Sequence, residues 1–251
     1  MSRESGDTRA QSSGHVHQWV ISAVSVVLLL LSGVIAIVAG AFDVERVDFG
    51  GLHRVSYDEA YRAAGIRPGD FMGTLDADGA REALSELPWV RTAEIGRHWP
   101  RTVEIDIVER VPAALALIAP DSWVLVDSEG RVLTTALASP PSLPRLSGIS
   151  AAPAPGRYLA PEAGALLDVL DTADGQPGFA VAAVWRDRRG DVRARISRQP
   201  DGAVFEAALG DDSAIGAKTA AIAAVVSDLA PSGAILDVSV PHLPVVRAED
   251  R

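Results

Sequence analysis

A chain of 251 residues has room for one large domain or two small ones. Its formal net charge of -10 argues against nucleic-acid binding, because proteins that neutralise phosphates accumulate lysine and arginine. The absence of cysteine excludes disulfides, thiolate metal sites, a cysteine nucleophile and a lipid-modified cysteine anchor. Lys218 is the only lysine, which together with abundant alanine, glycine and proline indicates a G+C-rich genome rather than a function.

The first strongly apolar stretch predicts a membrane helix. Residues 20–42 carry no charge and would span about 35 Å as a helix, enough for a hydrocarbon core of roughly 30 Å. Trp19 and Phe42 flank the stretch as interfacial aromatic residues do. A cleaved signal peptide is the alternative, because residues 39–41 fit a small-residue cleavage site, but the apolar stretch is longer than a signal core. We predict a disordered cytoplasmic tail over residues 1–18 and an uncleaved anchor over residues 19–42.

The stretch from residue 43 to 112 predicts a small α+β domain. Apolar residues from Val44 onward suggest a first strand, which the glycine pair at 50–51 ends. Ser56 and Glu59 form a capping box, in which each side chain satisfies an exposed backbone amide, so we expect a helix to start there.

A second helix and a hairpin complete this domain. The helix has one apolar stripe and ends at Pro88, which lacks a backbone donor. Its stripe consists of Ala80, Ala83, Leu84 and Leu87. Residues 90–97 and the alternating strand from Val103 then pair across a turn at 98–101. The predicted order is strand, helix, helix, strand, strand.

The same region resembles a known family in three runs: Leu-Pro-Trp-Val at 87–90, Ala-x-Ile-x-Arg-x-Trp-Pro at 93–100, and Val-x-Ile-x-Ile-Val-Glu-Arg-x-Pro-Ala at 103–113. These runs are similar to the POTRA domain of the FtsQ/DivIB family of bacterial cell-division proteins. The resemblance implies an essential, non-enzymatic scaffold of the division machinery, anchored by one membrane helix, that joins division proteins at the septum. With its composition, it also suggests a G+C-rich Gram-positive source.

Residues 113–247 predict a second, β-rich domain with flanking helices, and residues 248–251 a short tail. The predicted elements are a hairpin over 123–133 turning at 127–130, an irregular proline-rich connection over 140–161 that includes 143–148, a short helix around 166–170, strands over 180–185, 192–197 and 204–209, a helix over 215–229 and a last strand over 235–240. This region resembles the β-domain of the same family more loosely. The expected fold class is therefore α+β.

No motif for catalysis, cofactor or metal binding is found. Residues 210–219 approach a phosphate loop, but the spacing of Gly216 and Lys218 is wrong, and Asp211 and Asp212 would repel phosphates. In the family pattern Lys218 matches a recurring lysine, which we expect to be a structural donor. The alternative that stays open is a membrane-anchored exported enzyme of the cell envelope, with no recognisable local motif.

The main predicted site is the end of the second domain, where a terminal strand would leave unpaired amides and carbonyls for a partner strand. In the family this end receives the FtsB/FtsL pair. Pro241 and Pro244 cannot donate to such a ladder, so they would interrupt pairing or protect the edge from unwanted partners. The predicted partner-binding residues are Ile235, Leu236, Asp237, Val238, Ser239, Val240, Leu243, Val245, Val246 and Arg247.

Two further surfaces are candidates for contact. Arginines crowd one hairpin of this acidic chain, either as a solvated strand face or as a docking patch for acidic segments or lipid headgroups. The candidate docking patch is Arg186, Arg188, Arg189, Arg193 and Arg195. Small residues at Ser32, Ala36 and Gly40 form a stripe that would let another membrane helix approach closely, although such residues are also common in membrane helices generally.

The resemblance also sets the expected partners and place of action. It implies FtsB/FtsL-type (DivIC/FtsL) division proteins as partners, together with the septal peptidoglycan synthase complex. It implies a single-pass type II protein of the cell (inner) membrane at the division septum, with its N-terminus in the cytoplasm.

Overall fold

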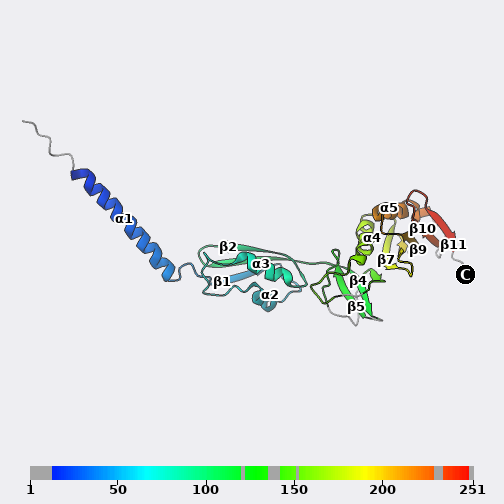
Figure 1. Cartoon of the computed structure of the whole chain (residues 1–251), viewed down its shortest axis with the longest axis horizontal. Coiled ribbons are helices and arrows are strands. Elements are labelled where there is room, and N and C mark those ends of the chain that lie inside the picture. Colours follow the sequence, from blue (N-terminus) through cyan, green and yellow to red (C-terminus); the bar gives the residue numbers. More distant parts are fainter. Residues whose placement is uncertain (1–12, 120–121, 135–141, 151–152, 229–233, 249–251) are drawn as a thin grey trace, which may run out of the picture. The chain divides into compact units, whose positions relative to one another are not determined.

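The structure is a computed structural model that describes residues 13–119, 122–134, 142–150, 153–228 and 234–248 (Figure 1). Its contacts divide the chain into two compact units. The first unit comprises Met1–Leu52, Ser56–Ala83 and Ala93–Ile107. The second comprises His53–Val55, Leu84–Thr92 and Val108–Arg251. The predicted domain boundaries stay predictions.

Helix α1, Ser13–Val38, contains the apolar stretch. Among the described residues it is the one helix long and apolar enough to cross a membrane, over Gln18–Val38, by a criterion of length and composition that a signal sequence also meets. It begins within the segment predicted to be disordered, of which residues 1–12 lie outside the described part. It also ends before Phe42, where we expected it to end.

A glycine cap explains the early end of α1. The amide of Ala41 donates to the carbonyl of Ala36 at 3.0 Å, and the amide of Gly40 to that of Ile37 at 3.1 Å. Gly40 has a φ of 71°, the left-handed conformation that glycine adopts most easily. These two bonds form a Schellman motif, which satisfies the last carbonyls and turns the chain away from the helix axis.

The first unit is built around a three-stranded sheet. In chain order its elements are β1 (Arg46–Gly50), α2 (Tyr57–Ala64), α3 (Ala77–Glu86), β2 (Val90–His98) and β3 (Thr102–Glu109). The strand order is β1-β3-β2, with β1 parallel to β3. The predicted element order is therefore observed, although α3 and β2 continue into the second unit.

Local signals in the sequence account for these elements. The Ser56 hydroxyl accepts the Glu59 amide at 3.2 Å, and Gly65 ends α2 with a φ of 66°. A side chain at Gly51, where φ is 76°, would come within 1.9 Å of the Ile107 carbonyl, so only glycine fits there. The buried apolar residues of the first unit are Val44, Val47, Ala60, Ala64, Ile66, Met72, Leu75, Ala80, Ala93, Val103, Ile105 and Ile107.

The second unit contains an eight-stranded sheet. Its strands are β4 (Pro112–Ala119), β5 (Ser122–Asp127), β6 (Arg145–Ser147), β7 (Phe179–Arg186), β8 (Val192–Arg198), β9 (Val204–Gly210), β10 (Ala234–Asp237) and β11 (Val245–Ala248). Their order is β11-β10-β9-β8-β7-β6-β4-β5. The neighbours β7, β8 and β9 pair antiparallel, as a meander joined by two short turns.

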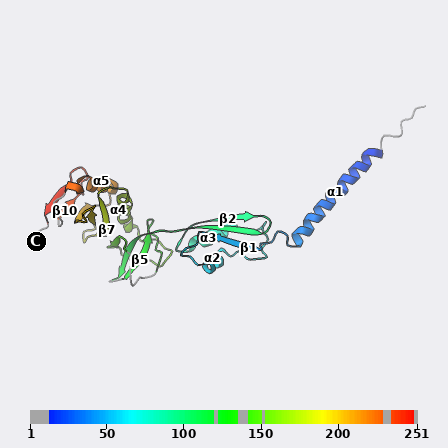
Figure 2. The same cartoon turned by 180° about the vertical axis from the view of Figure 1, so that it is seen from behind.

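Two helices pack on this sheet, α4 (Gly164–Asp174) after the short 3-10 helix η1 (Pro161–Ala163), and α5 (Ile215–Val225) before η2 (Val226–Asp228). Helix α4 contacts β7 and α5, and α5 contacts β9, so the helices lie side by side (Figure 2). Apolar side chains of both helices and one sheet face form the main core. On the opposite face, Leu115, Leu125 and Leu133 form a smaller cluster with Trp89, Trp123 and Leu143.

Several expectations for the second unit were wrong in detail. Strand β4 was not predicted, because an unbroken apolar run carries no alternation. The expected irregular connection contains β6, which lies in the sheet interior between β4 and β7. After the turn, the predicted hairpin partner of β5 forms only a bridge, Val126 to Val132. The predicted helix over 215–229 ends as α5 at Val225, followed by η2, with residue 229 outside the described part.

Candidate partner-binding site

The predicted partner-binding residues form one hairpin at the margin of the large sheet (Figure 1). Strand β10 pairs with β9 in parallel and with β11 antiparallel, in the register Ile235 with Arg247 and Asp237 with Val245. The predicted last strand is therefore an inner strand. Within the described residues, β11 is the outermost strand on this side.

The hairpin is fixed to the core from one side. Leu236 and Val238 are fully buried, and the Val238 amide donates to the Ala208 carbonyl at 2.9 Å. The Asp237 carboxylate accepts the amide and hydroxyl of Ser239 at 3.1 and 2.7 Å, and pairs with the Arg247 guanidinium at 2.9 Å. The Ser239 hydroxyl, with help from its amide and from Arg247, lowers the pKa of Asp237 below its ordinary value.

The turn at Asp237 corrects the predicted extent of the strand. We expected residues 235–240 to be extended, but β10 ends at Asp237, because its carboxylate binds Ser239 two residues on and bends the backbone. Pro241 and Pro244 lie in the connection before β11 and therefore do not interrupt either strand.

The outer part of the hairpin exposes apolar side chains. Val245 and Val246 point to opposite faces of β11, yet they are 48% and 50% exposed. Val240 and Leu243 in the connection are exposed as well. Arg247 adds a charged, exposed side chain to the same strand.

The other margin of the sheet is covered. Strand β5 bridges Val132 through Val126, the Leu133 amide donates to the Leu125 carbonyl at 2.8 Å, and the Leu125 amide donates to the Thr134 hydroxyl at 3.2 Å. Of the two margins, the described residues therefore leave β11 as the more open one.

The candidate docking arginines divide into two groups. Arg186 pairs with Asp212 at 2.7 Å, and Arg193 pairs with both Asp187 at 3.0 Å and Glu206 at 2.6 Å. These ion pairs link neighbouring strands and loops and neutralise the charges of Arg186 and Arg193.

The other three arginines of the patch form no ion pair among the described residues. Arg195 lies over the ring of Trp185 at 5.8 Å, a cation–π distance. Arg188 and Arg189 occupy the exposed β7–β8 turn. Three arginines of the candidate patch, two of them in this turn, therefore have no carboxylate partner among the described residues.

The proposed membrane-helix stripe is only partly helical. Ser32 and Ala36 lie on α1, one turn apart, and the Ser32 hydroxyl donates to the Leu29 carbonyl. Gly40 follows the end of α1 and caps it, so it does not extend the stripe.

Lys218 binds atoms of its own chain. Its side chain is 1% exposed, and its ammonium donates to the carbonyl and carboxylate of Asp211 at 2.8 and 2.7 Å. The Lys218 ammonium, followed by the hydroxyl and amide of Ser213, lowers the pKa of Asp211 to about 2. These contacts hold the loop before α5, which agrees with the expected structural donor.

A cluster of buried charges was missed from the sequence. Arg110 is 7% exposed and donates to Asp127 at 2.6 Å, Glu129 at 2.8 Å and the Val90 carbonyl at 3.1 Å. Its hydrogen bond lowers the pKa of Glu129. Arg131 donates to the carbonyls of residues 85–87, at the end of α3, where a cation is favourable.

A second missed feature lies beside this cluster. The Glu109 carboxylate accepts the backbone amides of His53, Arg54 and Val55 at 2.8–3.0 Å. Partial burial raises the pKa of Glu109, but the three amides outweigh it and hold the pKa below its ordinary value. The signal was the Glu-Arg pair at the end of an otherwise alternating strand, where charges at consecutive positions must find partners on both faces.

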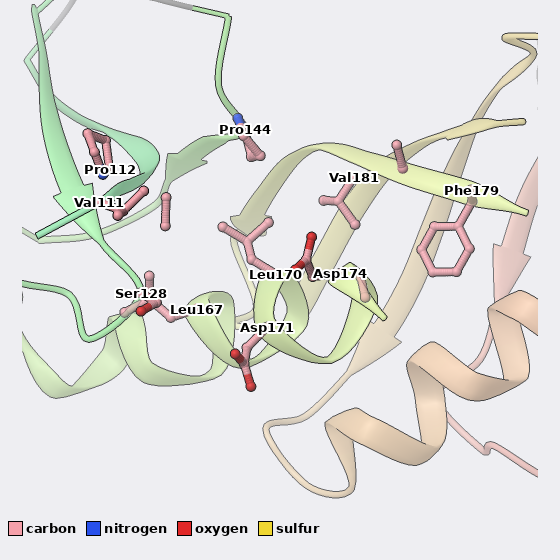
Figure 3. A pocket seen from close by; sticks show the side chains of 13 residues that line it. Val111, Pro112, Ser128, Pro144, Leu167, Leu170, Asp171, Asp174, Phe179 and Val181 are labelled. Carbon is pink, nitrogen blue, oxygen red and sulfur yellow. The ribbon is translucent and has the colours of Figure 1, made fainter. Parts of the chain in front are cut away.

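The second unit also contains a pocket of about 620 Å³. Figure 3 shows Val111 and Pro112 on one side, Leu167 and Leu170 of α4 in the middle, and Phe179 and Val181 of β7 on the other side. Asp171 and Asp174 add acidic groups. Within the described part of the chain, no group of three or more His, Asp or Glu residues could hold a metal ion.

Comparison with known proteins identifies the chain's relatives. Residues 42–110 match the POTRA domain of FtsQ type. The chain is 38% identical to the cell division protein FtsQ of Myxococcus fulvus over 90 residues, 36% of this chain and 31% of that protein. It is 30% identical to FtsQ of Mycolicibacterium smegmatis over 221 residues, 88% of this chain and 62% of that protein. The chain is similar to FtsQ cell division proteins over most of its length, and its POTRA domain is of FtsQ type.

The POTRA match and the observed fold confirm the α+β class and the POTRA domain expected from the sequence. FtsQ of Corynebacterium glutamicum is 30% identical over 112 residues, 45% of this chain and 50% of that protein, and fits the G+C-rich source inferred from composition. The alignments cover less than two thirds of the length of these FtsQ relatives. Helix α1 is the candidate membrane span of this chain.

Proposed function

We propose that this chain is a scaffold of the division machinery that binds other division membrane proteins by strand addition to β11. FtsB/FtsL-type proteins would supply the added strand, and the septal synthase complex would be recruited with them. The observation that carries the proposal is the position of β11, which has one strand neighbour among the described residues and two exposed valines.

Strand addition suits this hairpin physically. An outermost strand presents amides and carbonyls that a partner backbone can satisfy, while side-chain pockets on alternate positions give selectivity. The buried Leu236 and Val238 hold the hairpin in place, so less conformational entropy is lost on binding. The exposed Val240 and Leu243 offer additional apolar contact next to the strand.

The opposing interpretation is that this margin is protected against pairing. Pro244 stands directly before β11 and Arg247 lies on it, and both residue types blunt sheet margins in natural proteins. In that case β11 would bind nothing, and partner contacts would lie elsewhere.

Proline substitution separates the two interpretations. Consecutive amides of β11 point in opposite directions, so either Val245→Pro or Val246→Pro removes an outward amide and leaves the ladder to β10 intact. That variant should keep its thermal stability and lose about tenfold or more in affinity for FtsB/FtsL-type ectodomains. The threonine variant at the same position retains the amide and should bind nearly normally. Full affinity of both proline variants would eliminate β11 as the site.

We also propose that the scaffold has no catalytic activity and is placed at the septum with its N-terminus in the cytoplasm. The alternative of an exported envelope enzyme makes a different prediction on depletion of the chain. A scaffold predicts filamentous or septum-defective cells that a chain defective in partner binding does not rescue. Turnover of an envelope substrate by the purified chain, abolished by point substitutions, would support the enzyme instead.

A further inference from the structure

We infer that the β2–β3 turn of the first unit is a lipid contact, in which Trp99 lies in the headgroup region of the membrane beside Phe42. The inference rests on the proposed membrane anchoring and adds a second point at which the chain touches the bilayer. Neither the POTRA match nor the division role assigns a function to this turn.

The first argument is an aromatic pair at the end of the anchor. Phe42 follows the turn that ends α1, and its ring meets that of Trp99 edge to face, with centroids 5.9 Å apart and an interplanar angle of 69°. Trp99 remains 55% exposed. A large, exposed ring beside the end of an apolar helix is costly in water and favourable at a membrane interface, where tryptophan is enriched.

The second argument is that the folded unit begins at Phe42 itself. The Met72 amide donates to the Phe42 carbonyl at 3.0 Å, the Val44 amide to the Asp70 carbonyl at 2.8 Å, and the Glu45 amide to the Arg101 carbonyl at 2.8 Å. These bonds tie the chain leaving α1 to the β2–β3 turn and to the loop before α3.

Chain length then limits the distance of the turn from the membrane. Phe42 is four residues beyond Val38, the last residue of α1. Four residues span at most about 14 Å even when extended, and the capped turn between them is shorter. The polar interface of a bilayer is several ångströms thick on each side, and because the segment from Val38 to Phe42 is a capped turn rather than an extended chain, Phe42 and Trp99 stay close to it.

The charges around the turn favour an aromatic contact over an electrostatic one. Arg101 pairs with Glu45 at 3.0 Å, and His98 with Glu104 at 2.6 Å. The charge of Arg101 is thus matched by a carboxylate, and the attraction should not require anionic lipid. We therefore expect binding to neutral phosphatidylcholine that added salt leaves unchanged.

Fluorescence quenching by brominated lipid tests the contact. The full chain is reconstituted in phosphatidylcholine vesicles with ordinary or brominated acyl chains, and Trp19→Phe and Trp99→Phe are each compared with the natural chain. Trp19 is an exposed residue at the start of the candidate span and therefore reports the anchor. Each substitution should remove a comparable share of the quenchable emission. Tyr57→Trp, placed beside Phe49 at the far end of β1, should add emission that lipid does not quench.

The outcomes separate the inference from the anchoring. Quenching that falls with Trp19→Phe and stays unchanged with Trp99→Phe overturns the lipid contact and leaves the anchor. Quenching unchanged by both overturns the anchor, and the contact with it. Phenylalanine keeps the ring edge on Phe42, and Trp99→Tyr serves as a second variant whose thermal unfolding must match the natural chain.

Discussion

Individual charged residues in this chain mostly hold the fold together. Arg110, Arg131 and Lys218 are among the few charged side chains that are buried, and each donates to several oxygens of its own chain. A buried cation has lost its contact with water and is stabilised by the oxygens it binds, so removing one of these partners should cost more than removing a surface charge. The Nε of Arg131 is buried without a hydrogen-bond partner among the described residues, so this side chain is satisfied only through its terminal nitrogen.

Asp127 is the partner whose removal should destabilise the fold most. Asp127→Ala leaves the Arg110 guanidinium without its closest partner and two backbone amides, of Glu129 and Arg131, without an acceptor. We expect a loss of about 3–5 kcal/mol in unfolding free energy, measured by urea denaturation of the full chain in detergent. Glu129→Ala removes a half-exposed partner of the same arginine and should cost less than about 1 kcal/mol. Equal losses of unfolding free energy in the two variants would contradict the view that Asp127 is the main partner of Arg110.

The Lys218–Asp211 pair predicts a pH dependence. Because the folded pKa of Asp211, about 2, lies below its ordinary value of 3.8, the ionised carboxylate stabilises the fold. This contribution is complete above pH 3.8 and is lost as the pH falls towards 2.

Asp211→Asn should therefore be less stable than the natural chain at neutral pH, with a difference in melting temperature that shrinks through this acidic range. Asp168→Asn, which changes an exposed carboxylate without an ion-pair partner among the described residues, serves as the control. A difference that persists undiminished at the acidic end would rule out the pair as its cause.

At the scale of elements, the β7–β8 hairpin carries arginines that form ion pairs within the fold and arginines that are exposed to solvent. Its strand residues Arg186 and Arg193 pair with Asp212, Asp187 and Glu206, whereas its turn presents Arg188 and Arg189 to solvent. If this turn docks an acidic partner segment or lipid headgroups, its charge matters for binding and not for folding.

Charge reversal in the turn tests that role. Arg188→Glu with Arg189→Glu should weaken septal recruitment of a fluorescent fusion without lowering its melting temperature, because neither side chain supports the sheet. Arg62→Glu with Arg67→Glu makes the same change of net charge on exposed residues of α2 and of the loop after it, which have no ion-pair partner among the described residues, and should have no effect. Normal recruitment of the turn variant would leave the arginines with a structural role alone.

At the scale of the whole molecule, α1 is either a membrane anchor or a signal sequence. As an anchor, Gln18–Val38 keeps the protein in the membrane, whereas as a signal sequence it would be removed. The sequence around residues 39–41 allows cleavage, and the structure places these residues in the capped turn after the helix.

Fractionation and N-terminal sequencing decide between them. We expect the chain to stay in the membrane after alkaline washing and to keep its original N-terminus. Protease added outside the cell should digest the part beyond residue 43 and spare a tag at the N-terminus. A mature chain that begins near residue 42 would show that the helix is a signal sequence.

The sequence by itself determined the features that depend on neighbouring residues. The alternation from Val103 to Ile107, the Ser56 cap, the Gly65 end of α2 and the strands of the β7–β9 meander all follow from local periodicity and backbone preference. For the same reason, the resemblance was clearest in the POTRA region, where three elements follow one another without a gap.

Only the tertiary structure decided which strands become neighbours and which charges meet. Strand β6 has three residues and no distinctive pattern, and it is extended because β4 and β7 supply its hydrogen bonds on both sides. Likewise, Arg110 meets Asp127, and β11 rather than β10 becomes the outer strand, through pairings between segments distant in sequence. Periodicity records which face of a segment is buried, whereas the partner of that face is fixed by the order of strands, which no local pattern carries.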